Sequence, residues 1–149
     1  MGVTSSQNNV LYNKFENAVI EYYQFGSEEK RQMLSQILRN NDCCDIVAKS
    51  TDNSDLCSAF ICCSYKNHSE ILQAFLDCGI NINTKNKNGW TALMCASQYG
   101  HKEILQLLLN RGANIDLKNE DGQTALDYAK TDEIKEMIQN HINTSYILK

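Results

Sequence analysis

Apolar side chains recur at spacings of three and four residues near the start of the chain, a pattern that predicts amphipathic helices. A first helix is expected over residues 10–25, ending at Gly26, because glycine readily adopts the left-handed conformation that closes a helix. Ser27 is expected to cap a second helix that ends at Asn40, with Glu28 and Glu29 at the positive end of its dipole. The apolar faces consist of Val10, Leu11, Phe15, Ala18, Val19, Tyr22 and Tyr23 in the first helix and of Met33, Leu34, Ile37 and Leu38 in the second.

Two segments lack this periodicity. Residues 1–9 are mostly polar and are expected to be disordered. The pattern of residues 43–52 fits either the last turn of a helix or a short helix of its own. Together with the two predicted helices, residues 10–52 are expected to form an N-terminal cap on the rest of the chain.

From about residue 53 the pattern changes to a frame that returns every 33 residues. A fixed period of this length is the signature of stacked repeats, in which each repeat buries its apolar face only against its neighbours. The matching pairs are Gly89 and Gly122, Thr91 and Thr124, Ala92 and Ala125, Leu93 and Leu126, Ala96 and Ala129, and, one repeat earlier, His68 and His101, Ile71 and Ile104, Leu72 and Leu105, Leu76 and Leu109, and Gly79 and Gly112.

The best-preserved repeat spans residues 86–118, and its order of residues predicts two short helices after a tight turn. Asn88 and Gly89 are expected to form the tip of a hairpin, since both residue types tolerate a positive φ. Thr91 is expected to cap a first helix that ends at Gly100. A second helix is expected over residues 102–110, with Gly112 as its left-handed cap. Its buried face is predicted to hold Ile104, Leu105, Leu108 and Leu109.

Residues 86–116, NKNGWTALMCASQYGHKEILQLLLNRGANID, resemble an ankyrin repeat. The resemblance implies an all-α solenoid of helix–turn–helix units with hairpin-like fingers. Residues 53–85 would be a divergent repeat, 86–118 a regular one, and 119–149 a short C-terminal capping repeat with a tail. The match departs from the family pattern in three ways. Ala92 and Met94 replace the usual proline and histidine, Leu56 replaces the first finger glycine, and about three residues are missing between Ala129 and Ile134.

The resemblance also implies a use, because ankyrin repeats hold other proteins through their finger tips and the exposed side of each first helix. Trp90, the only tryptophan, is either a partner contact or a brace between its own finger and the next repeat, and the two roles are compatible. Mapped by phase, the candidate partner-binding residues are Lys87, Asn88, Trp90, Gln98 and Tyr99 in the regular repeat, Glu120, Asp121, Gln123, Lys130 and Thr131 in the next, and Ser54, Asp55, Cys57, Tyr65 and Lys66 in the first.

Catalysis and metal binding are not expected. Cys57, Cys62, Cys63 and His68 lie close in sequence, but their spacing fits no standard zinc motif. Cys62 aligns with Cys95, at a position where small side chains pack between helices. By the resemblance, His68 and His101 have a structural role and bind loop backbone. We therefore expect no enzyme activity, no catalytic residue, no metal and no cofactor.

Composition limits the classes of ligand and the cellular compartments that fit this chain. The net charge of −4 and the lack of a dense basic stripe argue against nucleic acid as a ligand. No apolar stretch is long enough to span a membrane, and the N-terminus lacks the features of a secretory signal. Seven cysteines without an export signal then predict a reducing, cytoplasmic setting with free thiols. The chain is expected to be a monomer. Only the Cys43–Cys44 pair stands outside the repeat frame as a candidate for modification.

An alternative interpretation starts from the N-terminus itself. Gly2 and Ser6 fit the short pattern for N-myristoylation. The alternative to a purely soluble binding module is therefore an adaptor recruited to a membrane through acylated Gly2.

Overall fold

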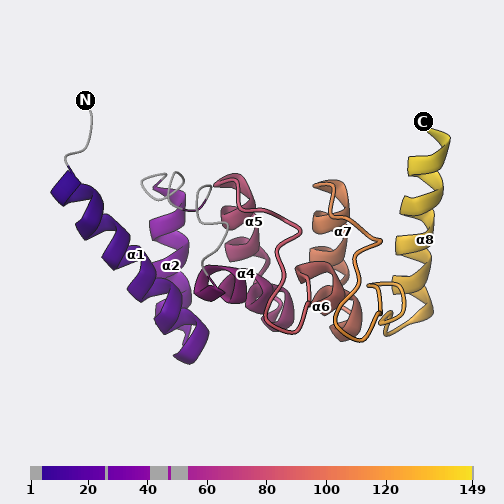
Figure 1. The fold of residues 1–149 in the computed structure, drawn as a ribbon, viewed down its shortest axis with the longest axis horizontal. Coiled ribbons are helices and arrows are strands. Elements are labelled where there is room, and N and C mark those ends of the chain that lie inside the picture. The colour runs from indigo at the N-terminus through magenta and orange to yellow at the C-terminus, as the bar shows by residue number, and fades with distance from the viewer. Residues whose placement is uncertain (1–4, 26, 41–46, 48–53, 149) are drawn as a thin grey trace. The chain divides into compact units, whose positions relative to one another are not determined.

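The computed structural model describes residues 5–25, 27–40, 47 and 54–148. Over these ranges the chain forms seven helices and no strand, in agreement with the expected all-α class (Figure 1). The helices are α1 (Ser5–Phe25), α2 (Glu28–Arg39), α4 (Ser54–Lys66), α5 (Ser69–Asp77), α6 (Ala92–Tyr99), α7 (Lys102–Asn110) and α8 (Asp132–Ile147). No helix in the described ranges combines the length and apolar character needed to cross a bilayer.

The chain divides into two units. The N-terminal unit holds residues 1–60 and 70–81, and the C-terminal unit holds residues 61–69 and 82–149. Helix α4 runs from one unit into the other, so the boundary does not coincide with a repeat.

The helix pair α1 and α2 of the N-terminal unit follows the predicted periodicity. Helix α1 starts at Ser5, so the helix includes residues that the sequence pattern assigned to a disordered terminus. Val10 and Tyr23, predicted on its apolar face, are instead 68% and 50% exposed. The apolar side chains that the described parts of α1 and α2 bury are Phe15, Ala18, Val19, Tyr22, Leu34 and Leu38.

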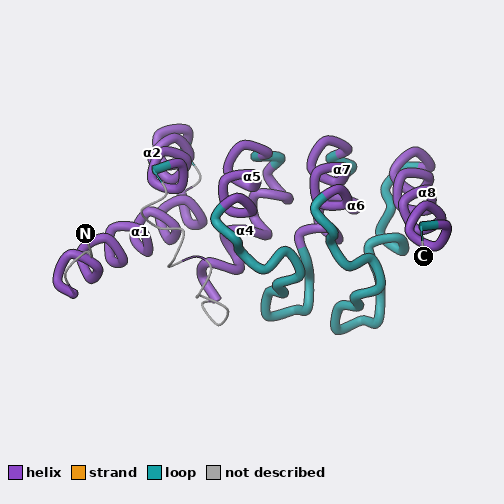
Figure 2. Tube along the Cα trace, turned by 90° about the horizontal axis from the view of Figure 1, so that it is seen from above, coloured by secondary structure: helices purple, strands orange, loops and turns teal. Residues whose placement is uncertain are grey.

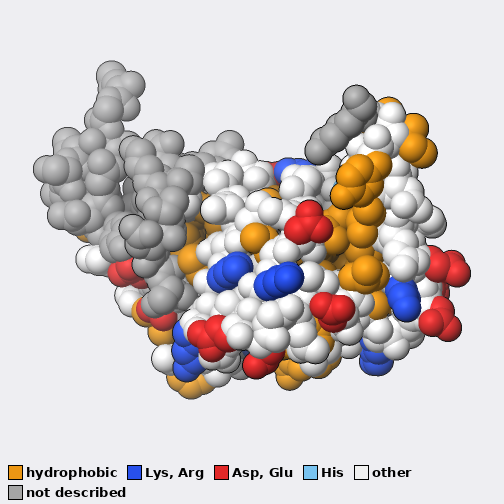
Figure 3. Space-filling model, turned by 45° about the vertical axis from the view of Figure 1, so that its right-hand side comes forward, with side chains coloured by type: hydrophobic (Ala, Val, Ile, Leu, Met, Phe, Trp, Pro, Cys, Tyr) orange, Lys and Arg blue, Asp and Glu red, His pale blue; other side chains and the backbone are white. Residues whose placement is uncertain are grey.

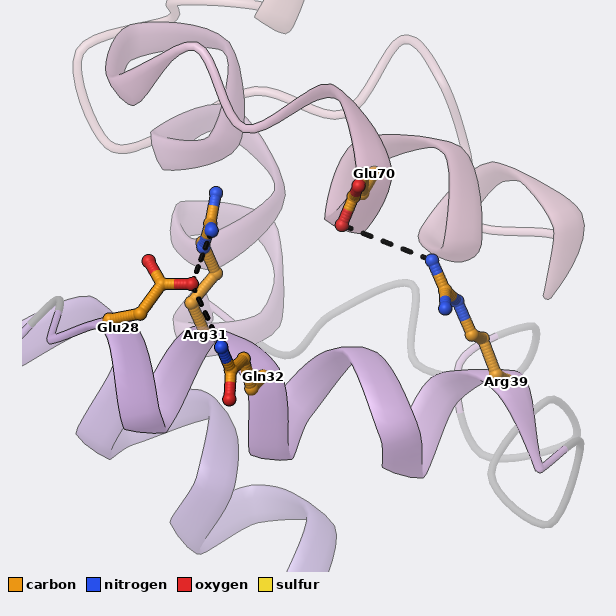
Figure 4. Close-up of polar contacts among 5 residues, drawn as sticks. All are labelled: Glu28, Arg31, Gln32, Arg39 and Glu70. Carbon is orange, nitrogen blue, oxygen red and sulfur yellow. Dashed lines mark hydrogen bonds and ion pairs between the residues drawn. The ribbon is translucent and has the colours of Figure 1, made fainter.

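Polar contacts lie at both ends of α2 (Figure 4). Ser27 is the N-cap residue, as predicted, but its side chain makes no capping hydrogen bond. Glu28, in the first turn, instead pairs with Arg31 and accepts a hydrogen bond from Gln32 Nε2 at 3.1 Å. At the other end of the helix, Arg39 lies 3.9 Å from the carboxylate of Glu70 on α5.

The first repeat has no finger glycine and begins differently from the regular one. Helix α4 has 13 residues, whereas its counterpart α6 has 8, because α4 starts five residues earlier in the frame. Leu56 therefore lies within a helix and is 1% exposed. Cys57, which the alignment placed among the partner-binding residues, is 7% exposed, so its prediction as a surface residue is wrong.

Helices α6 and α7 of the C-terminal unit match the sequence expectations closely. Thr91 caps α6, its hydroxyl accepting a hydrogen bond from Met94 N at 3.3 Å. Gly100 closes α6 with a φ of 74°, and Gly112, two residues after α7 ends, has a φ of 83°. The predicted face of α7, Ile104, Leu105, Leu108 and Leu109, is at most 1% exposed.

The shortened repeat ends the described fold with one helix instead of two. Residues 125–128 form a turn where the regular repeat has α6, since the three missing residues leave too little chain for a helix. Thr131 then caps α8, accepting from Ile134 N at 3.2 Å. Ile134 and Ile138 are buried, and the expected polar outer side is exposed; it consists of Asp132, Glu133, Lys135, Glu136 and Gln139.

Candidate protein-binding surface

Two long loops of the C-terminal unit extend away from the helices, one leading into α6 and one following α7 (Figure 2). We call them the first finger (residues 82–90) and the second finger (residues 115–123). Each finger is built around an asparagine. In the first, the Asn86 side-chain oxygen accepts from the amides of Asn88 and Trp90, both at 3.0 Å. The Asn86 amide also bonds the Trp90 carbonyl at 3.0 Å, which closes the loop.

The second finger repeats this arrangement at Asn119. Its side-chain oxygen accepts from the amides of Asp121 and Gln123, both at 3.0 Å. Its side-chain nitrogen donates to the hydroxyl of Tyr128 at 2.8 Å, and the residue is 7% exposed. An asparagine that bonds its own following backbone is a turn-forming element, so both loops have a defined conformation.

The two fingers also contact each other. Glu120 N bonds the carbonyl of Asn88 at 3.3 Å, and Lys85 Nζ bonds the carbonyl of Lys118 at 2.9 Å. Gly89 lies close enough to the second finger that an added Cβ would be 3.0 Å from Glu120 N. The fingers therefore form one continuous hydrogen-bonded surface.

The predicted two-residue tip at Asn88 and Gly89 is wrong in one respect. Only Gly89 has a positive φ, 76°, and Asn88 does not. The turn runs instead over four residues, closed by a 2.9 Å bond from Gly89 N to the carbonyl of Asn86. Asn86 and Asn119 were missed as the residues that organise the fingers, although they are separated by the same 33 residues as the glycines.

Trp90 lies against the next repeat. Its ring centroid is 4.4 Å from that of Tyr128, at an interplanar angle of 37°, and the side chain is half-buried. The hydroxyl of Tyr128 in turn bonds Gln123. Trp90 thus acts as the brace that the sequence suggested, and Gln123 supports it. Contact of either residue with a partner stays a prediction.

The other predicted contact residues fall into two groups. Lys87, Asn88, Glu120 and Asp121 are exposed at the finger tips, as is Gln123 beside them. On α6, Gln98 is half-buried and Tyr99 is 40% exposed. Figure 3 shows Lys and Arg interspersed with Asp and Glu on the face drawn, which fits a surface of mixed sign.

The cysteines of the C-terminal unit are packing residues. Cys62, Cys63 and Cys95 are buried free thiols, and burial raises the pKa of Cys62 and raises that of Cys95 to about 12. At neutral pH Cys62 and Cys95 are therefore protonated, and a protonated thiol is a poor nucleophile and a poor metal ligand. Among the described residues no three His, Cys, Asp or Glu side chains gather as a metal site would require.

One expectation about the thiols is wrong. Cys78, which follows α5, is disulfide-bonded. Of the described cysteines, Cys57 joins the three above as a free thiol. Cys43 and Cys44, the pair singled out for modification, lie outside the described residues, and so does Gly2.

His101 has the structural role that the resemblance implied. Its Nε2 lies 3.0 Å from the carbonyl oxygen of Tyr65 on α4. The ring thereby ties the start of α7 to the end of the preceding repeat's first helix.

In the C-terminal unit, the helix pair α6 and α7 is followed by α8 and carries two ordered loops, an arrangement typical of helical repeat proteins of the solenoid class. The family model described as "Ankyrin repeats (3 copies)" matches residues 59–144, more than half of the chain. The chain therefore belongs to the ankyrin repeat family, whose members are generally protein–protein interaction modules. A search of curated proteins found none that matches it.

Proposed function

We propose that this chain binds a partner protein through the two fingers and the exposed side of α6, and acts in the cytoplasm as an adaptor or an inhibitor. The observation that supports this most directly is the construction of the fingers. Their backbones are held by Asn86 and Asn119, while four neighbouring side chains make up the exposed tips: Lys87, Asn88, Glu120 and Asp121.

A loop that already has its bound conformation loses little conformational entropy on association. Such a loop suits recognition, and the hydrogen bonds of Asn86 and Asn119 hold both fingers in a defined conformation. In the proposal the chain supplies contact alone, since its family is typically non-enzymatic. An adaptor would leave its partner active, and an inhibitor would cover the partner's working surface.

The test is a pull-down from lysate of the source organism, analysed by mass spectrometry. The tip variant carries Lys87→Ala, Asn88→Ala, Glu120→Ala and Asp121→Ala, all at exposed positions. Trp90 and Gln123 are left unchanged, because they hold Tyr128 and their removal would disturb the finger.

The matched control carries the same number of alanines at exposed positions of the second helices: Glu103, Gln106, Glu136 and Gln139. Circular dichroism first checks that both variants are folded. We expect a partner that wild type and control retain and the tip variant loses. A partner kept equally by all three would exclude the finger tips, and no enriched partner would contradict the proposed function.

A further inference from the structure

Beside the fingers, the C-terminal unit exposes a cluster of aromatic rings. Tyr65 on α4 and Tyr99 on α6 meet edge to face, with centroids 4.6 Å apart and an interplanar angle of 87°. They remain 50% and 40% exposed, although they are large and partly apolar. Tyrosine combines contact area with few rotatable bonds, which is why it is favoured at binding surfaces.

His101 holds this pair in place. Its ring stacks beside Tyr99, with centroids 6.2 Å apart and an angle of 17°. The same ring reaches the carbonyl of Tyr65 through Nε2 at 3.0 Å. A carbonyl oxygen can only accept, so Nε2 is the nitrogen that carries the proton. The three residues form one rigid cluster across two repeats.

Two lysines flank the cluster. Lys66 follows Tyr65 in α4 and is half-buried. Lys130 lies on the other side, where its Cδ would be 3.2 Å from a Cβ added at Gly100, between Tyr99 and His101. Its backbone amide bonds the carbonyl of Ser97 at 3.2 Å, which fixes it against the end of α6. We call Tyr65, Lys66, Tyr99, His101 and Lys130 the tyrosine strip.

The two segments that carry the tyrosines contain a single charged side chain, and it is basic. Residues 61–69 contain no charged side chain except Lys66, and α6 contains none. Several acidic groups lie close to these residues in the sequence. Glu103 follows His101 by two residues, and Glu70, four residues after Lys66, lies 3.9 Å from Arg39. Asp127 accepts from Thr124 N at 2.8 Å and from its hydroxyl at 3.1 Å, and Glu133 pairs with Lys102. Asp132 lies in the first turn of α8. The fingers, in contrast, mix both signs.

We propose that the tyrosine strip is the docking site for an acidic peptide segment of the partner protein. An apolar side chain of that segment packs where the rings of Tyr65 and Tyr99 meet. Carboxylates on either side of it pair with Lys66 and Lys130. This inference rests on the proposed function and names the chemistry of the partner. Two lysines are few for a nucleic acid, whose binding draws on many phosphate contacts, so a peptide is favoured.

The experiment selects peptides from a random phage-displayed library on the full-length protein. The proposal expects the enriched peptides to be net acidic and to share an apolar residue. A synthetic peptide of the enriched sequence should bind less tightly as salt rises. Reversing both charges, with Lys66→Glu and Lys130→Glu, should weaken binding by about tenfold or more, since each lost pair turns into a repulsion.

Three further variants keep the result interpretable. Lys66→Arg with Lys130→Arg retains the charges and should retain the affinity. Tyr99→Ala should weaken binding without any change in charge. Lys14→Glu with Lys135→Glu makes the same charge change at exposed positions of α1 and α8, outside both the strip and the fingers. It should leave the affinity within about twofold, because exposed pairs outside the contact contribute little. Circular dichroism verifies the fold of each variant.

The outcomes separate this proposal from the broader one. Enriched peptides without an acidic bias would overturn the tyrosine strip and leave the proposed function standing. Peptides that the tip variant loses and the Lys66→Glu, Lys130→Glu variant keeps would do the same. Binding of labelled polyuridylate that depends on Lys66 and Lys130, without acidic peptides, would overturn it in favour of a nucleic acid. A selection that enriches nothing would also overturn it, and the pull-down would then decide the function alone.

Discussion

Gly89 and Gly122 occupy the same position in consecutive fingers, yet their surroundings differ. Both have a positive φ, of 76° and 75°. An added Cβ at Gly89 would be 3.0 Å from Glu120 N and 3.1 Å from Asn119 Cα, whereas nothing lies within 4 Å at Gly122. The sequence shows why each position needs glycine, but only the structure shows that the first finger lies directly against the second.

This difference gives a matched pair of substitutions. Gly122→Ala should lower the free energy of unfolding by about 1–2 kcal/mol, the cost of a left-handed residue with a Cβ. Gly89→Ala should lower it further, since the backbone of Asn119 and Glu120 must also shift. Urea unfolding followed by circular dichroism measures both. Equal losses would mean that the close approach of the fingers contributes nothing to stability.

Asp127 offers a test that depends on pH. Its pKa is lowered from the ordinary 3.8, first by the Thr124 amide and then by the Thr124 hydroxyl. The folded state thus favours the ionised carboxylate, and this contribution is present above pH 3.8 and is lost as the pH falls through the lower folded pKa. Asp127→Asn does not titrate, so its stability should fall less than that of wild type between about pH 6 and about pH 2. Parallel losses in urea unfolding at the two pH values would refute this.

At the scale of the helices, the sequence is most informative where a repeat is regular. Helix α7 has the predicted bounds and buried face, because its apolar spacing, Gly100 and Gly112 all agree. The early start of α4 and the turn at residues 125–128 were not predicted, since both depend on residues that the frame lacks. The finger conformation was only partly foreseen. Asparagine side-chain bonds such as those of Asn86 leave no hydrophobic pattern, and only their recurrence after 33 residues marks them.

The helix caps differ in a way that can be measured. Thr91→Ala should lower the free energy of unfolding by about 1 kcal/mol or more, since the Met94 amide loses its partner and the site is 3% exposed. Ser27→Ala, at a cap whose hydroxyl makes no such bond, should change it by less than about 0.5 kcal/mol. Chemical denaturation of both variants provides the comparison. A larger loss at Ser27 would contradict the assignment of the caps.

At the scale of the whole chain, the two ends differ in how much apolar surface they bury. In the N-terminal unit, Phe15, Val19 and Ile20 of α1 line a small pocket together with Leu56 of α4. In the same unit Phe60 and Phe75 pack edge to face, with centroids 6.1 Å apart. Helix α8 instead presents a polar outer side and an exposed end. The position and polarity of the N-terminal helices and of the last repeat led to their prediction as caps. The contacts of α1 with α4 could not be predicted, because the helical periodicity shows which face is apolar but not which helix covers it.

Deleting the N-terminal helices should therefore destabilise the fold, whereas deleting the end of α8 should not. A fragment lacking residues 1–52 should aggregate or bind a hydrophobic dye, because Leu56 and its neighbours lose their cover. A chain lacking residues 144–149 should remain folded and monomeric, since every described side chain in that segment is exposed. Size-exclusion chromatography with light scattering checks both. A monomeric, folded fragment 53–149 would mean that α1 and α2 form a separate module.

In the fingers, the residues that set the backbone conformation are different from those that face solvent. Asn86, Gly89, Asn119 and Gly122 set the path of the backbone, whereas the side chains at 87, 88, 120 and 121 face solvent. Substitutions at the four solvent-facing positions can alter shape and charge without changing the loop that presents them. The fold thus provides a small set of positions at which descendants of this protein, or an engineered library, can exchange one partner for another while the repeat itself stays the same.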